Sequence, residues 1–594
     1  MKSTIIKRVS LVTRTIKVGL AMVIPILFIG SMTVMLGSFP IQAYQDFLDS
    51  FLGGALRSIL ATIQLGTVGA LAVYITLALG FAYMNSLEER PSLVNIFGSL
   101  MCSIAGFLII VGFFAGEPDL SLLSGQGVFS AMVAGLVAPV LFRRFRDAFK
   151  IRKMVFVEGA DSVFNASLRI VMPFLCVVAV FAAFNYLITV CFQVQSLQHL
   201  FMKAMNAVFF RMQRSYFSGL LFIALSCVMW WFGIHGNNVL NQVAEDMFTA
   251  IIPGQIVSKS FIDTFVFMGG TGCTLGLLIA MIVFGKRSST KKLSRMAVLP
   301  GIFNIGELFV FGFPILYNPY MLLPFILSPL LCFTNAYLVT AAGLLPQVTE
   351  TVVWTTPALL GGYLATGSVT GVIVQLVNIL ISAACYAPFV IMYEKKSLSE
   401  FSSAYDELVD LQKKNETSEG KGMLTESEGN TGRLAKYLAI DLDDALGSSA
   451  NTLSADYQLQ FDNEGRCMAA EAFIKWDHGR YGRVYPPLVV QIARESGILF
   501  ELESFFIEKA VSDAENYRKQ YGDDFKMKMS ISRSTLRDKR IIPFLQEVAD
   551  RYRLRAGWIC IRTEEGAGEA ETDEMLRMIR AYGYSIEGVE ENAL

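Results

Sequence analysis

One of the three histidines in this 594-residue chain, His235, lies where a hydrophobic run ends. The stretch 228–239 reads VMWWFGIHGNNV and combines bulky apolar residues with histidine, glycine and asparagine. Polar groups at membrane depth need protein or water partners, so they mark candidate functional sites. We therefore predict that His235 and Asn237 bind a ligand. Gly233 and Gly236 would let the backbone leave the helix at this point.

A second polar group interrupts the apolar stretch 297–320, AVLPGIFNIGELFVFGFPILYNPY. Glu307 is the only charged residue between Met296 and Thr349, and Asn304 lies three residues before it. Glycine and proline prevent one continuous helix here, which predicts a re-entrant hairpin. The interrupting residues are Pro300, Gly301, Gly306, Gly312, Pro314 and Pro319.

Trp354, in VVWTTPALLGG (352–362), places an aromatic ring before another break in the chain. An indole that stacks on a sugar face, with histidine and glutamate bonded to hydroxyls, is the chemistry of a saccharide site. Each residue also has a structural explanation. His235 would be a hydrogen-bonded histidine at the membrane edge, Glu307 a buried carboxylate paired with a basic residue, and Trp354 a tryptophan of the interfacial belt. The occurrence of His235 and Glu307 on two glycine-broken segments favours a shared polar cavity.

The near-neutral charge of the whole chain conceals two unlike parts. Residues 1–396 carry 25 Lys+Arg and 15 Asp+Glu, whereas residues 397–594 carry 25 and 36. A membrane span needs about 20 predominantly apolar residues with few charges, so the first part reads as a polytopic membrane domain and the second as soluble. We expect three segments: the membrane domain at 1–396, a polar linker at 397–431 and a soluble domain at 432–594.

The hydrophobic pattern predicts membrane spans near nine stretches: 18–38, 67–85, 93–115, 126–142, 168–192, 216–234, 262–285, 319–343 and 366–393. Basic clusters lie in the N-terminal tail and at 142–153, 285–295 and 394–396, and such clusters mark the cytoplasmic side. Three apolar stretches between the second and third clusters cannot return the chain to the same side. One of them is therefore re-entrant, or a further span lies in 195–215.

Several motifs occur together in the first part: IPILFIGSMTVML, WWFGIHGNN, MGGTGCTLGL, GIFNIGELFVFGFPILYNP and VWTTPALLGGYLATG. In this order and spacing they resemble the lactose/cellobiose-type enzyme IIC permeases of the bacterial phosphotransferase system. Leu308 and Val353 stand where that family usually has proline.

The resemblance implies an all-α membrane domain of about ten transmembrane helices and two re-entrant hairpins, forming a homodimer in the bacterial inner membrane. It implies a disaccharide of the cellobiose, chitobiose or lactose class as substrate, and enzymes IIB and IIA acting in trans, because no cytoplasmic Cys-x-x-Gly-x-Ser stretch occurs in this chain. Both the N-terminus and the soluble domain would be cytoplasmic. We expect no catalytic residue, metal or cofactor. The residues that would bind sugar are His235, Asn237, Asn304, Glu307 and Trp354, with re-entrant glycines at Gly233, Gly236, Gly269, Gly270, Gly306 and Gly312.

The soluble domain alternates strand-like and helix-like patterns, which predicts an α/β fold. YQLQFDNEGRCMAAEAFIKW, with PPLVVQIARESGIL and MSISRSTLRD after it, is similar to the start of EAL domains, whose active members hydrolyse cyclic di-GMP. A complete barrel of this kind needs about 250 residues, so this domain would be an incomplete (β/α) barrel.

Alignment by this resemblance indicates a degenerate metal site. Glu471 keeps the hallmark carboxylate, but Lys475 replaces an arginine, Ser530 replaces an asparagine ligand and Ile561 stands at a glutamate ligand. The tail would then be regulatory, with cyclic di-GMP or a protein as its partner and no role for a nucleic-acid polymer. Two alternatives stay open: a membrane sugar receptor that signals through the tail, and a membrane-anchored phosphodiesterase.

Overall fold

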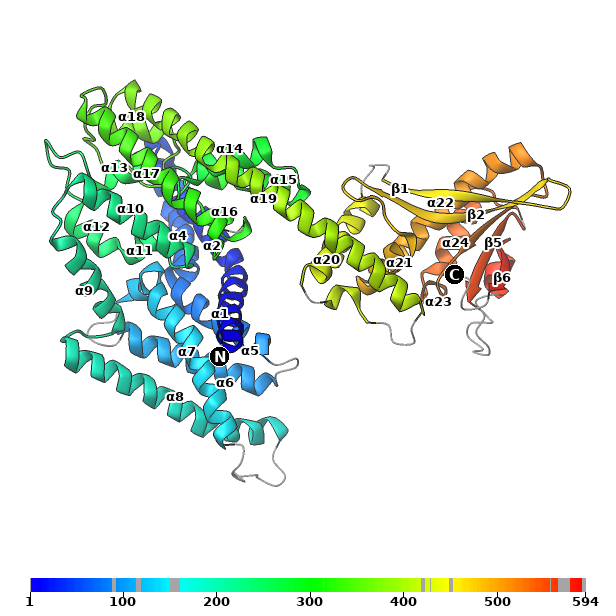
Figure 1. Ribbon diagram of the computed structural model, residues 1–594, viewed down its shortest axis with the longest axis horizontal. Coiled ribbons are helices and arrows are strands. Elements are labelled where there is room, and N and C mark those ends of the chain that lie inside the picture. Colours follow the sequence, from blue (N-terminus) through cyan, green and yellow to red (C-terminus); the bar gives the residue numbers. More distant parts are fainter. Residues whose placement is uncertain are drawn as a thin grey trace. The chain divides into compact units, whose positions relative to one another are not determined.

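The computed structural model divides the chain into two compact units, Met1–Glu394 and Lys395–Leu594 (Figure 1). It describes residues 2–87, 92–113, 119–149, 161–313, 315–417, 422–427, 429–447, 452–555, 557–564 and 577–589. The first unit ends two residues before the expected end of the membrane domain at residue 396. One helix, α19 (Val369–Thr417), contains this boundary.

The described residues of the first unit form helices joined by loops, without a strand. Its longer helices are α1 (Lys2–Met22), α2 (Ile24–Gly37), α4 (Ala55–Gly66), α5 (Leu71–Leu87), α6 (Leu93–Val111), α7 (Val128–Phe149), α8 (Ser162–Phe192), α9 (Leu197–Phe210), α10 (Tyr216–Trp231), α14 (Thr274–Phe284), α15 (Ser288–Ile302) and α17 (Pro319–Ala341). Its shorter helices are α3 (Gln42–Ser50), α11 (Gly236–Val239), α12 (Asn241–Met247), α13 (Lys259–Phe265), α16 (Glu307–Gly312), α18 (Leu360–Thr366) and the 3-10 turns η1 (Phe51–Gly54), η2 (Val68–Ala70), η3 (Leu120–Leu123) and η4 (Gly125–Gly127).

Within the described residues, six helical segments are long and apolar enough to cross a membrane, or seven if the bent pair α1 and α2 forms one span. This is fewer than the nine stretches predicted. The stretch 216–234 forms α10, which has only 16 residues. The predicted span 262–285 is wrong as a continuous helix, because glycine turns separate α13 from α14. The expected break within 297–320 is confirmed by the gaps between α15, α16 and α17.

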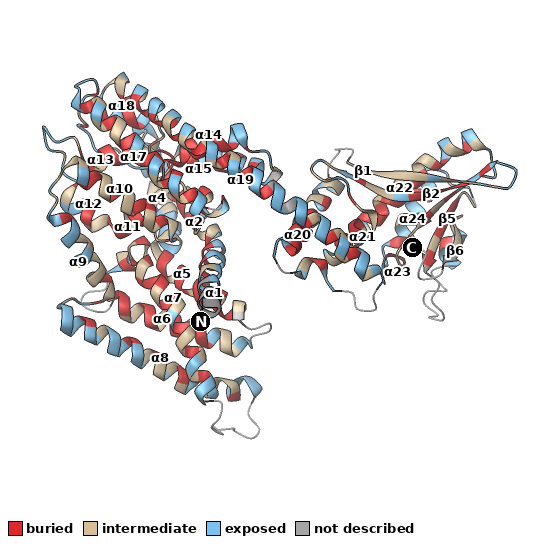
Figure 2. Cartoon of the chain, viewed as in Figure 1, coloured by how far each residue is buried: buried red, intermediate tan, exposed pale blue. Residues whose placement is uncertain are grey.

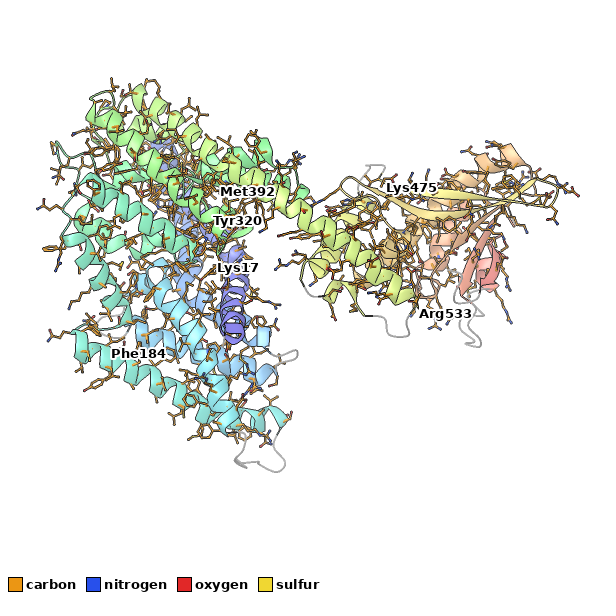
Figure 3. The ribbon with its side chains drawn as sticks, viewed as in Figure 1. Lys17, Phe184, Tyr320, Met392, Lys475 and Arg533 are labelled. Atoms are coloured by element: carbon orange, nitrogen blue, oxygen red, sulfur yellow. The ribbon has the colours of Figure 1, made fainter. Side chains whose placement is uncertain are left out.

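Apolar side chains are exposed along α8, as on a helix that faces lipid. Phe184, labelled in Figure 3, is 45% exposed, and Leu187 and Val190 on the same helix are also exposed. Only 17% of the most apolar 18-residue stretch within residues 162–210, the segment that begins with α8, is buried within the chain. An aqueous surface rarely shows so long an apolar face, so α8 fits a bilayer environment.

The second unit has a six-stranded sheet with helices packed on one face. Its strands are β1 (Leu453–Phe461), β2 (Cys467–His478), β3 (Gly482–Arg483), β4 (Lys526–Ser530), β5 (Ile559–Glu564) and β6 (Ser585–Val589). Its helices, besides the end of α19, are η5 (Leu424–Glu426), α20 (Gly429–Gly447), α21 (Pro486–Glu495), α22 (Leu499–Tyr521), α23 (Arg533–Leu536) and α24 (Ile541–Arg551).

Strand order follows the chain, β1-β2-β4-β5-β6, with β1 antiparallel to β2 and the later neighbours parallel. Parallel strands joined in sequence by helices are the repeating unit of a (β/α) barrel. Met527, Met529 and Ile561 point to the covered face and pack with buried apolar residues of α22 such as Ile507. Figure 2 shows buried residues on the helices of this unit. The predicted α/β domain is confirmed.

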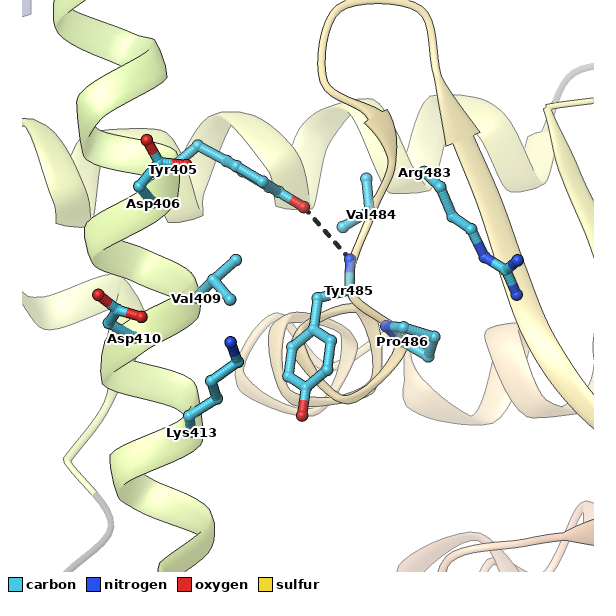
Figure 4. Close-up of a pocket in the computed structure, with 9 residues that line it drawn as sticks. All are labelled: Tyr405, Asp406, Val409, Asp410, Lys413, Arg483, Val484, Tyr485 and Pro486. Carbon is cyan, nitrogen blue, oxygen red and sulfur yellow. Dashed lines mark hydrogen bonds between the residues drawn. The ribbon is translucent and has the colours of Figure 1, made fainter.

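The structure differs from the predicted polar linker. Residues 397–417 continue α19, and Ala404 and Leu408 are buried against a second core that includes Leu438 and Trp476. A cavity of about 420 Å³ lies beside this helical end. Figure 4 shows residues that line it, among them Tyr405, whose hydroxyl accepts a hydrogen bond of 3.3 Å from the Tyr485 backbone nitrogen. The end of α19 is therefore a packed part of the second unit.

Candidate functional site

His235 lies at the start of the short helix α11, directly after α10 ends. Gly233 has a positive φ of +86°, which turns the chain, and the His235 ring nitrogen Nδ1 accepts a hydrogen bond of 3.3 Å from the Asn238 backbone nitrogen. Gly236 lies against the α10 backbone, since a Cβ there would approach the Ser226 carbonyl oxygen to 2.3 Å. The chain therefore leaves α10 between Trp231 and Gly236, where these glycines lie.

Trp230 packs against His235. Their ring centroids are 4.5 Å apart, and the Trp230 ring also lies 6.2 Å from that of Phe311 on α16. Phe311 and Glu307 are four residues apart on α16, so they lie on the same side of that helix. The tryptophan thus links the His235 turn to the helix that begins at Glu307.

Asn304 joins three separate segments through its side chain. Its Oδ1 accepts a hydrogen bond of 2.8 Å from the Gly269 backbone nitrogen. Its Nδ2 donates bonds of 2.8 Å to the carbonyl oxygens of Trp354 and Thr356. Both ends of the carboxamide are hydrogen-bonded to backbone groups, so Asn304 holds these segments together. This role differs from the sugar contact predicted for it.

The glycine turn 268–273 comes within contact distance of the turn before α16. Gly269 and Gly270 have φ values of +82° and +102°, which favour glycine strongly. A Cβ on Gly270 would lie 3.0 Å from the Gly306 nitrogen, and one on Gly306 would lie 3.0 Å from the Gly269 oxygen. These glycines therefore allow two backbones to approach closely, whereas Gly312 lies farther along, next to Leu293.

Asn237 connects the His235 turn to the same glycine turn. Its Nδ2 donates a hydrogen bond of 3.3 Å to the Thr271 hydroxyl. Its Oδ1 is buried without a hydrogen-bond partner in the described structure, as are Glu307 Oε2 and Trp230 Nε1. A buried polar group without a partner is costly, so these three atoms are candidates for binding a ligand.

Trp354 is brought to this junction by its backbone, while its side chain is 46% exposed. The structure thus connects the segments that carry His235, Asn237, Asn304, Glu307 and Trp354. The sequence pattern singled out neither Thr271 nor Trp230, although both contact these segments. The position of Trp230, five residues before His235, carried no recognisable signal.

In the second unit, charged side chains gather on the sheet face opposite the helices. Alternate residues of a strand share a face, which places Glu471, Lys528 and Arg562 together. Arg562 forms an ion pair with Glu471 through its Nη1, and Lys528 lies 3.1 Å from the Glu587 carboxylate. The hydrogen bond from the Lys528 ammonium holds the pKa of Glu587 below its usual value. This polar sheet face consists of paired charges.

Comparisons with known proteins agree with this division. The model of the family "Phosphotransferase system, EIIC" matches residues 17–329. The chain belongs to this family. The EAL domain model matches residues 440–587, so the second unit carries an EAL domain.

We call the first unit, Met1–Glu394, the EIIC unit, because the family match lies within it. Curated relatives cover about two thirds of the chain. The oligo-beta-mannoside-specific EIIC component of Bacillus subtilis (strain 168) is 26% identical over 404 residues, covering 63% of this chain and 88% of that protein. The cellobiose-specific EIIC component of Geobacillus stearothermophilus is 27% identical over 419 residues, covering 65% and 91%. A solved structure, the transporter ChbC of an N,N'-diacetylchitobiose-specific phosphotransferase system, is 25% identical and covers 66% of this chain and 95% of its own, with a TM-score of 0.39.

The positions predicted for a degenerate EAL site do not all lie together. Ser530 is in register with Arg562 on the polar sheet face. Ile561 instead faces the helices and is fully buried in the core. Lys475 lies farther along β2, where it pairs with Asp477 at 3.2 Å (Figure 3). The side chain that meets Glu471 is Arg562, and within the described residues no group of three or more His, Cys, Asp or Glu could hold a metal ion.

Proposed function

We propose that the EIIC unit binds a disaccharide of the cellobiose, chitobiose or lactose class and carries it across the membrane. The observation that supports this most directly is the junction at Asn304, which ties the segments of Glu307, Trp354 and the glycine turn together. The names of the relatives, which include cellobiose-specific and oligo-beta-mannoside-specific components, point to the same class of sugar.

In this proposal, the Glu307 carboxylate accepts hydrogen bonds from sugar hydroxyls, and His235 binds a further hydroxyl. Asn237 and Trp230 add one acceptor and one donor, because Asn237 Oδ1 and Trp230 Nε1 have no hydrogen-bond partner among the described residues. Trp354 stacks on a sugar face, since its ring is half exposed. Asn304 acts by holding the surrounding backbone.

The membrane arrangement that goes with this function has about ten transmembrane helices and two re-entrant hairpins, one of them at 297–320. The broken helices at α13–α14 and α15–α16 support it, because irregular backbone is tolerated at membrane depth only where it lines a cavity or is buried in protein. The basic clusters support a cytoplasmic N-terminus and EAL domain. A homodimer, and enzymes IIB and IIA supplied as separate proteins, complete the assembly.

The EAL domain has a regulatory role in this proposal and does not hydrolyse cyclic di-GMP. The Arg562–Glu471 ion pair supports this, because it occupies the carboxylate expected to bind metal. Cyclic di-GMP or a protein would be its partner. A receptor that senses sugar without transporting it would use the same binding groups, so transport itself must be measured.

The test is uptake of radiolabelled cellobiose and diacetylchitobiose into proteoliposomes that contain the chain, with enzymes IIA and IIB and a phosphoryl donor supplied. We expect phosphorylated sugar to appear in the presence of the chain, and not with Glu307→Gln or His235→Ala. Glu245→Gln and His199→Ala are matched controls, because Glu245 pairs with Asn241 on exposed α12 and His199 bonds to Ser196. Binding without uptake would contradict transport and favour the receptor.

A further inference from the structure

Four polar side chains form a ladder along α19 inside the EIIC unit. They are Gln375, Asn378, Ser382 and Tyr386, and their spacing of three and four residues places them on one face of the helix. All four are almost completely buried, with exposures of 1%, 0%, 0% and 0%. Buried polar groups in an apolar helix need partners, so the contacts of this ladder identify what it does.

Each rung donates a hydrogen bond to a carbonyl oxygen of residues 264–273. Gln375 and Asn378 bond to Thr264 and Phe265 at 2.7 and 2.8 Å. These two carbonyls lie in the last turn of α13, where helix geometry leaves carbonyl groups without partners.

Ser382 and Tyr386 hold the other end of the same segment. The Ser382 hydroxyl donates to the Cys273 carbonyl oxygen at 2.8 Å, and the Tyr386 hydroxyl donates to that of Gly272 at 2.7 Å. The glycine turn 268–273 is therefore fixed to α19 on both sides.

The segment held by the ladder is also part of the candidate sugar site. Gly269 bonds to Asn304, and Thr271 bonds to Asn237. Gln375 reaches a second part of the site, since its Oε1 accepts bonds of 2.7 and 2.8 Å from the backbone nitrogens of Leu359 and Gly362, which follow Trp354 in the chain.

We propose that Gln375, Asn378, Ser382 and Tyr386 are positioning residues of the sugar site. This inference rests on the proposed sugar-binding function. The ladder holds the glycine turn in the register that places Thr271 against Asn237 and Gly269 against Asn304. Sugar affinity then depends on side chains of α19 that bond to the supporting backbone.

Tyr386→Phe tests this proposal with the smallest change, because it removes one hydroxyl and keeps the buried ring. We expect the dissociation constant for the sugar to rise about tenfold, the effect of one hydrogen bond. Thr340→Val is the matched control: it removes a buried hydroxyl whose one bond within the described residues goes to the Ala336 carbonyl oxygen of its own helix, α17. Its sugar affinity should stay within about twofold of wild type.

A double-mutant cycle separates positioning from a general loss of stability. Tyr386→Phe and Thr271→Val should be coupled in sugar affinity, because both act on the same turn, whereas Thr340→Val and Thr271→Val should be additive. Thermal unfolding of each variant is measured in parallel. Should Tyr386→Phe not accumulate in the membrane, Ser382→Ala takes its place with the same criteria.

Two failures are distinguishable by calorimetry on the full chain with cellobiose and diacetylchitobiose. If wild type binds neither sugar, the proposed function fails. If wild type binds and Glu307→Gln does not, but Tyr386→Phe keeps wild-type affinity and shows no coupling to Thr271→Val, then the positioning role is overturned.

Discussion

At the scale of single residues, Asn304 shows how one amide can assemble a site from distant parts of the chain. It bonds to Gly269, 35 positions away, and to Trp354, 50 positions away. Asparagine suits this position because it tolerates the positive φ of +63° observed there and offers both a donor and an acceptor.

Trp230 provides a prediction at this scale. Trp230→Phe keeps an aromatic ring against His235 but removes the buried Nε1–H, which has no partner in the described structure. We expect sugar binding to weaken by about 1 kcal/mol.

Trp354→Ala, which removes a stacking ring, should weaken sugar binding by about 1–3 kcal/mol. Calorimetry checks both values; unchanged affinity in Trp230→Phe would show that this indole packs only against protein.

The residues that could be predicted are those whose chemistry conflicts with their surroundings. His235 and Glu307 interrupt apolar segments, so each was recognisable from the sequence alone. Thr271 was not, because a threonine in a glycine-rich stretch has no such conflict. The face of Ile561 was not predictable either, since alignment to a motif assigns a position in the chain but a strand's pairing decides where its side chain points.

At the scale of elements, α15 leads directly to the site, and a residue more than 100 positions later in the chain, Glu394, binds the backbone at its N-terminal end. Glu394, near the middle of α19, accepts bonds of 2.9 Å from the backbone nitrogens of Lys286 and Arg287 and of 2.8 Å from Arg287 Nε. Thr290 Oγ1 donates a fourth bond at 2.8 Å. The carboxylate satisfies backbone groups just before α15 and is almost fully buried.

We predict that Glu394→Ala lowers the free energy of unfolding by about 3–5 kcal/mol, because it leaves the buried Arg287 guanidinium without this partner. Asp49→Ala is the control, since it breaks an exposed pair with Arg57 and should cost less than about 1 kcal/mol. Thermal unfolding in detergent compares the two variants. Equal stability would mean that the cap contributes little.

Element boundaries were predictable where glycine and proline interrupt apolar runs, as between α15 and α17. They were not predictable at 397–417, where many polar residues concealed a helix with only a narrow buried stripe that includes Ala404 and Leu408. The broken helix at 262–285 was missed for the opposite reason. Its apolar composition resembles a span, while the turn depends on Gly269, Gly270 and Gly272 and on bonds to α19.

At the scale of the whole molecule, the chain joins an EIIC unit to an EAL domain. Two-metal hydrolysis of a phosphodiester requires several oxygen ligands around a pair of ions. The Glu471 carboxylate bonds to Arg562 and, at 3.2 Å, to the Gln460 amide. The carboxylates of Glu471 and Glu587 on the polar sheet face are therefore paired with Arg562 and Lys528.

We predict that the full chain, incubated with cyclic di-GMP and Mg²⁺ or Mn²⁺, yields no linear dinucleotide. Chromatography of the products checks this, with an active EAL enzyme as the positive control. A linear product that disappears in Glu471→Ala would contradict the prediction and make the chain a membrane-anchored phosphodiesterase.

The central claim is that the junction around His235, Asn304 and Glu307 binds a disaccharide. Isothermal titration calorimetry of the purified full chain with cellobiose and with diacetylchitobiose tests it most directly. We predict saturable binding of at least one of these sugars to wild type, and its loss in Glu307→Gln and in His235→Ala while both variants remain folded. Wild-type affinity in both variants would contradict the claim.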